Sequence, residues 1–152
     1  MPSISTSTPV GHLTIDERDG AIVAIRWADD TAGSNGSALL NDAVGQLQEY
    51  FAGRRMRFDL PLAAAGTSFE KRVWAAMSAI PFGETRTYGD LAHDLDSGPR
   101  AIGRACGRNP IPIVVPCHRI LARHGIGGFS GGTGLPTKEL LLSLEGVMLK
   151  AA

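Results

Sequence analysis

The feature that most constrains this chain is a short apolar run held between prolines, Pro110-Ile111-Pro112-Ile113-Val114-Val115-Pro116. Proline fixes φ, so the run is rigid, and its apolar side chains predict burial. Cys117, His118 and Arg119 follow at once. We expect the run to act as a rigid mount that presents a thiol, an imidazole and a guanidinium side by side.

Composition bounds the class of protein but not its partner. The chain has 152 residues, of which 43% are hydrophobic and 20% charged, which is typical of a soluble globular protein with one large or two small domains. The formal net charge is zero. The charge is uneven, however, because residues 97–138 contain no acid and six basic residues: Arg100, Arg104, Arg108, Arg119, Arg123 and Lys138. This stretch predicts an anion-seeking face, and an ordinary solvated surface is the alternative.

The cysteines indicate a reduced compartment. Cys106 and Cys117 are the two cysteines of the chain, with no Cys-x-x-Cys pair and no histidine at a metal-ligand spacing. Residues 1–10 lack the charged start and apolar core of a signal peptide, and no run approaches the roughly 20 apolar residues of a membrane helix. We therefore expect a cytoplasmic protein without a membrane segment, in which a free thiol can be catalytic.

The first part of the chain reads as a small α/β module over residues 1–63. Strands are predicted at residues 12–15 and 21–27, joined by a turn at Asp19-Gly20, and a third strand at residues 56–60. A small polar loop at residues 31–36 precedes a helix from Ser37 to Gly53. No chemical motif occurs here, so the expected role of the module is support.

The second part, residues 67–152, reads as mostly helical after a linker at residues 63–66. A capping box at Thr67–Glu70 opens one helix, a similar pattern at Thr87–Asp90 opens a short second one, and Pro99 begins a third that ends near Gly107. The last two resemble a helix-turn-helix, with an ordinary helical hairpin as the alternative. A glycine-rich loop over residues 125–134 and a final helix ending at Gly146 complete the domain.

Arginines mark one face of the third helix. Arg100, Arg104 and Arg108 recur every four residues, and Ala101 is among the small residues that let this helix approach another surface closely. A helix that combines arginines with small side chains can enter a DNA groove and contact phosphates.

Cys117 is the candidate nucleophile, and a buried structural cysteine is the alternative. An ordinary thiol is only slightly ionised at neutral pH, so it needs a base or a neighbouring cation. Side chains of adjacent residues in an extended segment diverge, so we expect a water to connect His118 with the thiol. The histidine then needs a carboxylate, and the acids that remain after Asp96 are Glu139 and Glu145. Spacing does not choose between them.

Several motifs together resemble the O6-alkylguanine-DNA alkyltransferase family over residues 67–146. The central one is Pro116-Cys117-His118-Arg119-Ile120. The others lie on both sides of it: residues 82–88 (Phe-Gly-Glu-Thr-Arg-Thr-Tyr), residues 99–103 (Pro-Arg-Ala-Ile-Gly), Arg104-x-x-x-Arg108-Asn109-Pro110, the Pro-Ile-Val-Val-Pro run, residues 127–132 (Gly-Gly-Phe-Ser-Gly-Gly) and Lys138-Glu139 with Glu145-Gly146.

The resemblance implies an α+β (α/β) protein. Its small N-terminal sheet-plus-helix module precedes a mostly helical C-terminal domain with a winged helix-turn-helix-like DNA-binding motif. It also implies a monomer without cofactor or metal that flips O6-alkylguanine, and also O4-alkylthymine, out of double-stranded DNA. The alkyl group would pass irreversibly to a cysteine, once per molecule.

The implied residue roles follow the motif positions. In the reaction, Cys117 is the alkyl acceptor and His118 the base that acts through a water. Glu145 holds His118, Asn109 braces the active-site segment, and Tyr88 donates a proton to the leaving guanine. Around the base, the implied residues are Phe129, Ser130 and Ile120, whose carbonyl would read the exocyclic amine together with that of Cys117. On the DNA, they are Arg100, which would fill the space of the flipped base, with Ala101, Arg104, Arg108 and Arg119.

Some residues depart from the family pattern. Phe129 lacks the hydroxyl of the tyrosine often found there, Arg104 stands where some members have a small residue, and extra residues lie around Thr133-Gly134. No cysteine precedes Cys106, so the zinc site of some members is expected to be missing. The rival hypotheses are a DNA-binding or regulatory module that does not react, which Cys117 argues against, and a thiol hydrolase or redox protein.

Overall fold

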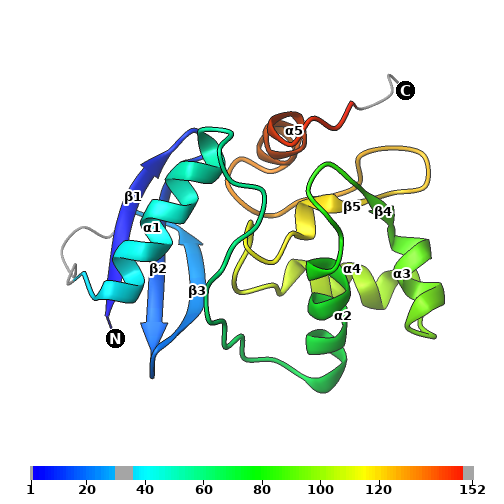
Figure 1. The fold of residues 1–152 in the computed structure, drawn as a ribbon. Helices are drawn as coiled ribbons and strands as arrows, with labels where there is room; N and C mark the ends of the chain where they lie inside the picture. Colours follow the sequence, from blue (N-terminus) through cyan, green and yellow to red (C-terminus); the bar gives the residue numbers. More distant parts are fainter. Residues whose placement is uncertain (1, 30–35, 149–152) are drawn as a thin grey trace. The chain divides into compact units, whose positions relative to one another are not determined.

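The structure, a computed structural model, describes residues 2–29 and 36–148. The chain forms two compact units, residues 1–65 and residues 66–152, named unit 1 and unit 2 below (Figure 1). The loop predicted at residues 31–36 lies, apart from Gly36, outside the described residues.

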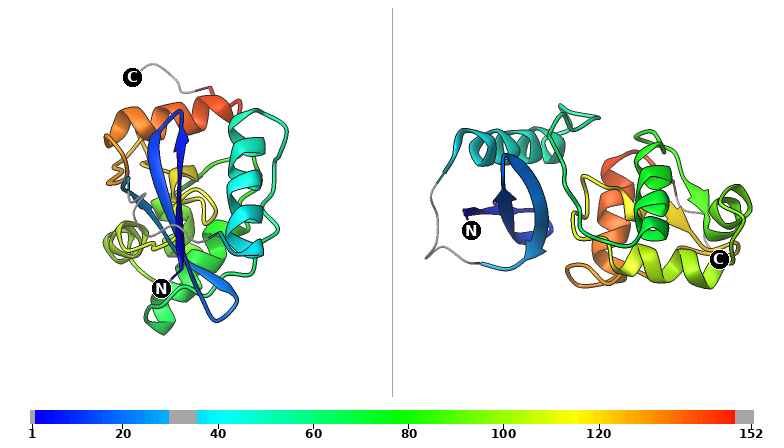
Figure 2. Two further views of the ribbon diagram at one scale, coloured as in Figure 1. Left: turned by 90° about the vertical axis from the view of Figure 1, so that its left-hand side faces the viewer. Right: turned by 90° about the horizontal axis from the view of Figure 1, so that it is seen from below.

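Unit 1 is a three-stranded antiparallel sheet in the order β1 (Ser3–Thr8), β2 (Gly11–Arg18), β3 (Ala21–Trp27). Helix α1 (Ala38–Phe51) packs on one face of this sheet (Figures 1 and 2). Leu13 and Ile15 of β2 are fully buried together with Leu40 and Leu47 of α1, which gives the unit its core. The predicted Asp19-Gly20 turn forms between β2 and β3.

The strands of unit 1 differ from the prediction in two places. Residues 56–60 form no strand, and Leu62, which follows them, forms an isolated parallel bridge with Ile22. Strand β1 was not predicted because its Ser/Thr-rich sequence lacks an apolar alternation. It forms because its backbone pairs with β2 over six residue pairs, from Ser3–Asp16 to Thr8–Gly11. In both cases the outcome depended on whether another strand pairs with the segment, not on its own side-chain pattern.

Unit 2 is mainly helical. Its helices are α2 (Ser68–Ser78), α3 (Tyr88–Asp94), α4 (Pro99–Gly107) and α5 (Leu135–Leu144), with a 3-10 turn η2 (Cys117–Arg119). The short strands β4 (Arg86–Thr87) and β5 (Ile120–Leu121) pair in parallel. Both predicted capping boxes form, at Thr67 with Glu70 and at Thr87 with Asp90. The predicted α+β class with a mostly helical second part is confirmed.

Helices α3 and α4 pack together as the helix-turn-helix pair. Residues 95–98 connect them, and Asp96 (φ 51°) adopts a left-handed conformation that turns the chain. Gly98 then caps α4, and Pro99 occupies its first turn. Trp74 of α2 donates from Nε1 to the Ala105 carbonyl at 2.8 Å, so α4 is held from behind while its other face stays exposed.

The proline-bounded run forms a tight buried turn. Ile111, Ile113 and Val115 are buried, and the Val115 N–H donates to the Ile111 carbonyl at 2.9 Å. Ile113 has φ 75°, which is costly for a β-branched residue, about 1–3 kcal/mol. Packing on all sides holds this strained turn directly before Cys117. Among the described helices, none has the length and apolar character needed to traverse a bilayer.

Candidate active site

Cys117 begins η2 and carries a buried free thiol. Its backbone N–H donates to the Val115 carbonyl at 2.8 Å. Asn109 braces the same turn, because Nδ2 donates to the Val115 carbonyl (2.8 Å) and Oδ1 accepts from the Ile111 N–H (3.0 Å). The rigid mount expected from the prolines is therefore completed by one asparagine side chain.

The segment around Cys117 is not extended, which corrects the basis of one expectation. Residues 117–119 form a 3-10 turn, in which successive side chains point about 120° apart. Cys117 and His118 therefore diverge as expected, but for a different geometric reason. The turn forms because the Arg119 N–H closes on the Pro116 carbonyl at 3.0 Å.

The two residues after Cys117, His118 and Arg119, take part in a buried charged network. His118 Nε2 lies 2.7 Å from Glu145 Oε2, and both side chains are fully buried. Arg119 donates to both Glu145 oxygens, from Nε at 2.8 Å and from Nη2 at 3.1 Å, and from Nη1 to the Ile80 carbonyl at 2.6 Å. One carboxylate at the end of α5 thus binds two residues of η2.

Sequence spacing did not decide whether Glu139 or Glu145 is the carboxylate beside His118. In the structure His118 pairs with Glu145, whereas Glu139 is exposed on α5. An ionised carboxylate only accepts hydrogen bonds, so Nε2 of the neutral imidazole carries the proton and Nδ1 the lone pair. Within the described residues, Nδ1 is the one buried side-chain nitrogen or oxygen without a hydrogen-bond partner in the protein. The imidazole is held with its basic nitrogen unoccupied.

Burial controls the ionisation of this site. Burial raises the pKa of the Cys117 thiol, although the Asn109 side chain and the Lys138 charge oppose the rise. Burial lowers the pKa of His118, and the hydrogen bond that His118 donates to Glu145 opposes this shift. At neutral pH the thiol is therefore protonated and the imidazole is neutral. A nucleophilic step must remove the thiol proton as the reaction proceeds.

Lys138 is a site residue that sequence reasoning missed. Its side chain is fully buried, and Nζ donates to the carbonyls of Ile120 (2.6 Å) and Gly128 (3.1 Å). Burial lowers its pKa to about 8. A signal existed in the sequence, because Lys138 shares a helical spacing with Leu141, Leu142 and Glu145, the buried face of α5.

Tyr88 stands beside Lys138 at the start of α3. The Lys138 Nζ lies 5.9 Å from the centre of the Tyr88 ring, and burial raises the pKa of the phenol to about 12. Gly127 (φ 76°) allows this packing, since a Cβ there would come within 3.0 Å of Tyr88 Cε2. A phenol with this pKa keeps its proton at neutral pH and can donate it.

The residues that we expected to surround the flipped nucleobase lie on β5 and on the glycine-rich loop over residues 125–134. Phe129 is half-buried and Ser130 is exposed, both on the loop that Lys138 anchors through Gly128. Ile120 is buried, and its carbonyl already accepts one hydrogen bond from Lys138. A carbonyl oxygen has two lone pairs, so this one retains a single position for another donor.

Most of the residues that we expected to contact DNA lie on α4 or at its C-cap. Arg100, Arg104 and Arg108 are exposed, Ala101 is half-buried, and Arg108 Nη1 lies 3.4 Å from Glu70 Oε2. Arg119 is placed differently, because it is only 7% exposed and its guanidinium is bound to Glu145 and Ile80. The DNA contact expected of Arg119 does not fit this placement. Its position supports the site from within.

Within the described residues, no group of three His, Cys, Asp or Glu side chains gathers as a metal site would require. The site is built from protein groups: a thiol, an imidazole–carboxylate pair, a phenol and an ammonium. This set suits nucleophilic attack assisted by proton transfer.

Comparison with known proteins agrees with this chemistry. Residues 68–147 match the family model described as "6-O-methylguanine DNA methyltransferase, DNA binding domain", and residues 3–64 match that of the "ribonuclease-like domain" of the same proteins. The chain belongs to the 6-O-methylguanine DNA methyltransferase family. The two matched regions fall within unit 2 and unit 1, respectively.

Members of this methyltransferase family resemble the chain over nearly its full length. The methylated-DNA–protein-cysteine methyltransferase of Mycolicibacterium paratuberculosis is 40% identical, over 93% of this chain and 90% of the relative. The constitutive enzyme of Bacillus subtilis is 36% identical over 96% of each. The crystal structure of Mycobacterium tuberculosis OGT in complex with DNA matches with a TM-score of 0.85 and 38% identity, over 95% of this chain and 92% of that one.

Proposed function

We propose that this protein repairs DNA by transferring the alkyl group of O6-alkylguanine to Cys117, once per molecule. Membership of the methyltransferase family supports the reaction class. The observation that carries the proposal is the buried pair of His118 Nε2 and Glu145 Oε2 (2.7 Å), formed by the residue next to the buried free thiol of Cys117. The binding partner is double-stranded DNA that contains the lesion, and O4-alkylthymine is the second lesion we expect it to accept.

The proposed reaction balances as a single substitution. Cys117 Sγ attacks the alkyl carbon, the new S–C bond forms, and the C–O6 bond breaks with its electron pair on guanine. A water passes the thiol proton to His118 Nδ1, and Glu145 stabilises the resulting imidazolium. Tyr88 donates its proton to the departing guanine and is reprotonated from solvent, while His118 releases its own. The products are intact guanine and an S-alkyl thioether.

The thioether explains why the protein acts once. A thioether is not hydrolysed under cellular conditions, and the other thiol, Cys106, donates to Met77 Sδ at 3.5 Å rather than to a base. The reaction also requires a reduced Cys117, which fits a reducing cytoplasm. We expect the protein to act as a monomer.

The DNA-facing part of the proposal rests on α4. Its exposed Arg104 and the exposed residue at its C-cap, Arg108, can contact phosphates, and Arg100 at its N-terminus can enter the base stack. Extruding a paired base costs a few kcal/mol, which a side chain in the vacated space and a pocket for the base offset. Phe129, Ser130 and the Ile120 carbonyl are the groups we assign to that pocket.

Intact-mass spectrometry tests the function. After incubation with excess duplex that contains O6-methylguanine, the wild type should gain one methyl group, on Cys117. Cys117→Ser should bind the duplex and gain none, while the matched variant Cys106→Ser should react like the wild type. Turnover beyond one equivalent, or a methyl group on Cys106, would exclude the proposal. Binding without transfer by the wild type would favour a module that reads damage without repairing it.

A further inference from the structure

A basic turn in unit 1 has no part in the reaction proposed above. Residues 1–65 contain eight acidic and five basic residues, yet three of the basic ones fall together in Arg54-Arg55-Met56-Arg57. The turn follows directly after α1. Arg54 and Arg57 are exposed, and Met56 between them is 66% exposed. Positive charge is thus concentrated at one place in an otherwise acidic unit.

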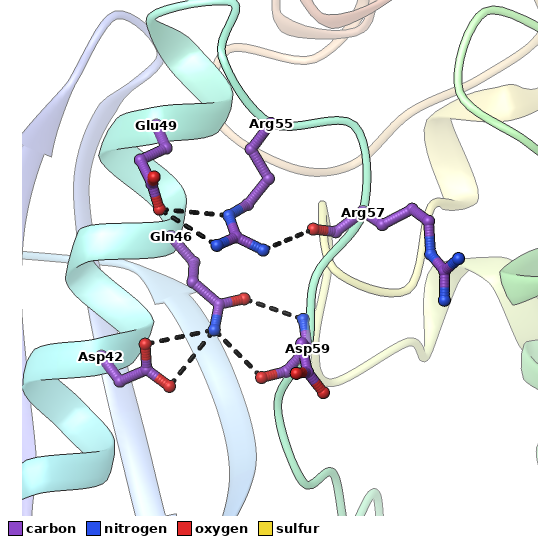
Figure 3. Close-up of polar contacts among 6 residues, drawn as sticks. All are labelled: Asp42, Gln46, Glu49, Arg55, Arg57 and Asp59. Atoms are coloured by element: carbon purple, nitrogen blue, oxygen red, sulfur yellow. Dashed lines mark hydrogen bonds and ion pairs between the residues drawn. The ribbon is translucent and has the colours of Figure 1, made fainter.

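Arg55 fixes this turn to the end of α1 (Figure 3). Its Nε and Nη2 lie 3.2 Å and 3.1 Å from Glu49 Oε1, and its Nη1 donates to the Arg57 carbonyl at 2.9 Å. The Arg54 N–H also donates to the Glu49 carbonyl at 2.9 Å. The guanidinium of Arg55 and the carboxylate of Glu49 are therefore used within the fold.

Gln46 holds the far end of the same segment. Its buried amide accepts from the Asp59 N–H at 2.8 Å and donates to the Asp59 carbonyl at 3.0 Å. The amide also donates to the Asp42 carboxylate at 3.2 Å. Residues 54–59 have no regular secondary structure, but these contacts fix the segment at both ends.

Arg54 and Arg57 are the side chains that this framework leaves available. Figure 3 shows the Arg57 side chain pointing away from the other five residues drawn. Among the ion pairs formed by described residues, none involves Arg54 or Arg57. A guanidinium presents a planar fork that matches phosphate oxygens, and a fixed backbone reduces the entropy lost on binding.

We propose that the turn Arg54–Arg57 is a second phosphate-binding surface, at which Arg54 and Arg57 contact the sugar–phosphate backbone of DNA. This inference rests on the proposed function, which brings the protein to duplex DNA. Each neutralised phosphate releases counterions and steepens the salt dependence of binding by about 0.9 in a double-logarithmic plot. Two contacts contribute about 1.8, equally on damaged and undamaged duplex.

The test compares two double variants of the full chain on undamaged duplex. Arg54→Ala/Arg57→Ala should lower the slope of log affinity against log salt by about 1.8. The matched variant Arg18→Ala/Lys71→Ala removes two other exposed charges and should change the slope by less than half as much. Arg54→Lys/Arg57→Lys should keep most of the slope. Methyl transfer at saturating DNA should match the wild type in all three, which shows that they fold.

An unchanged slope in Arg54→Ala/Arg57→Ala, or an equal loss in the matched variant, would overturn the proposal. If the slope is unchanged but the variant binds polyglutamate more weakly, the turn binds an acidic protein rather than DNA, and the proposal is overturned too. Failure of the proposed function is a separate result. It would appear as wild-type protein that gains no methyl group, whereas the slope is measured on DNA without a lesion.

Discussion

Replacing Glu145 by glutamine tests whether one carboxylate supports both the fold and the reaction. Glu145 accepts one hydrogen bond from His118 and two from Arg119, all in a buried network. A glutamine of the same size has one oxygen to accept and an NH₂ group that can only donate. At least one of these donors would therefore face another donor.

The size of the stability loss follows from this mismatch. Removing one partner of a buried ion pair costs about 3–5 kcal/mol, because the remaining charge loses its compensation. Glu145→Gln keeps the volume and one acceptor, so we expect a loss of about 3 kcal/mol in the free energy of unfolding. For a chain of this length, that loss lowers the melting temperature by about 6–12 °C.

The effect on the reaction comes from the tautomer of His118. A glutamine NH₂ that donates to Nε2 forces the proton onto Nδ1, which then cannot take the proton of the thiol. Loss of a general base slows a reaction by about 10²–10⁴-fold, so methyl transfer at pH 7 should slow by at least 100-fold. Burial raises the pKa of Cys117, so the thiol stays protonated at neutral pH, and the rates of wild type and variant should converge only at a pH above the ordinary range of a thiol.

The assay measures single-turnover methyl transfer from pH 6 to 10 at saturating duplex, at a temperature where every variant is folded. Glu139→Gln removes an exposed acid from the same helix and should leave rate and stability unchanged. Arg119→Gln breaks the network but keeps the His118–Glu145 bond, so it should lower stability with little effect on the rate. A slow Glu139→Gln with a normal Glu145→Gln, or an Arg119→Gln that loses as much rate as Glu145→Gln, would refute the reasoning.

Three further predictions follow from other parts of the site. Gly127→Ala should slow methyl transfer at least tenfold in the same assay, because residue 127 has φ 76° and its new Cβ would approach Tyr88 Cε2 within 3.0 Å. Gly125→Ala, which has open space around it, should leave the rate unchanged. Arg100→Ala should slow methyl transfer from duplex DNA at least tenfold, but the rate with the free base O6-methylguanine should stay near that of the wild type. Equal losses with both substrates would exclude insertion of Arg100 into the base stack. The lowered pKa of His118 means that the unfolded chain takes up a proton near pH 6.5 and the folded chain does not. Urea unfolding should therefore show stability falling below pH 6.5 by up to about 1.4 kcal/mol per pH unit, less so in His118→Gln than in the exposed control His93→Gln.

The sequence alone determined the features that depend on neighbours a few residues apart. The starts of α2 and α3 were predictable because a capping box is closed between residues i and i+3, at Thr67–Glu70 and Thr87–Asp90. The buried mount before Cys117 followed from the prolines and the apolar run. The family resemblance of the motifs around Cys117 likewise needed no structure.

Tertiary structure decided which distant groups meet. Glu145 is 27 residues from His118, and α5 had to pack on η2 before Glu145, rather than Glu139, became its partner. The same packing buried Lys138 and Arg119, which the sequence places in a basic stretch that reads as surface. Whether a charge faces water or a carboxylate depends on which elements cover it. That depends on burial of apolar surface across the whole unit: helical spacing places Lys138 on the apolar face of α5, but it does not show which element covers that face.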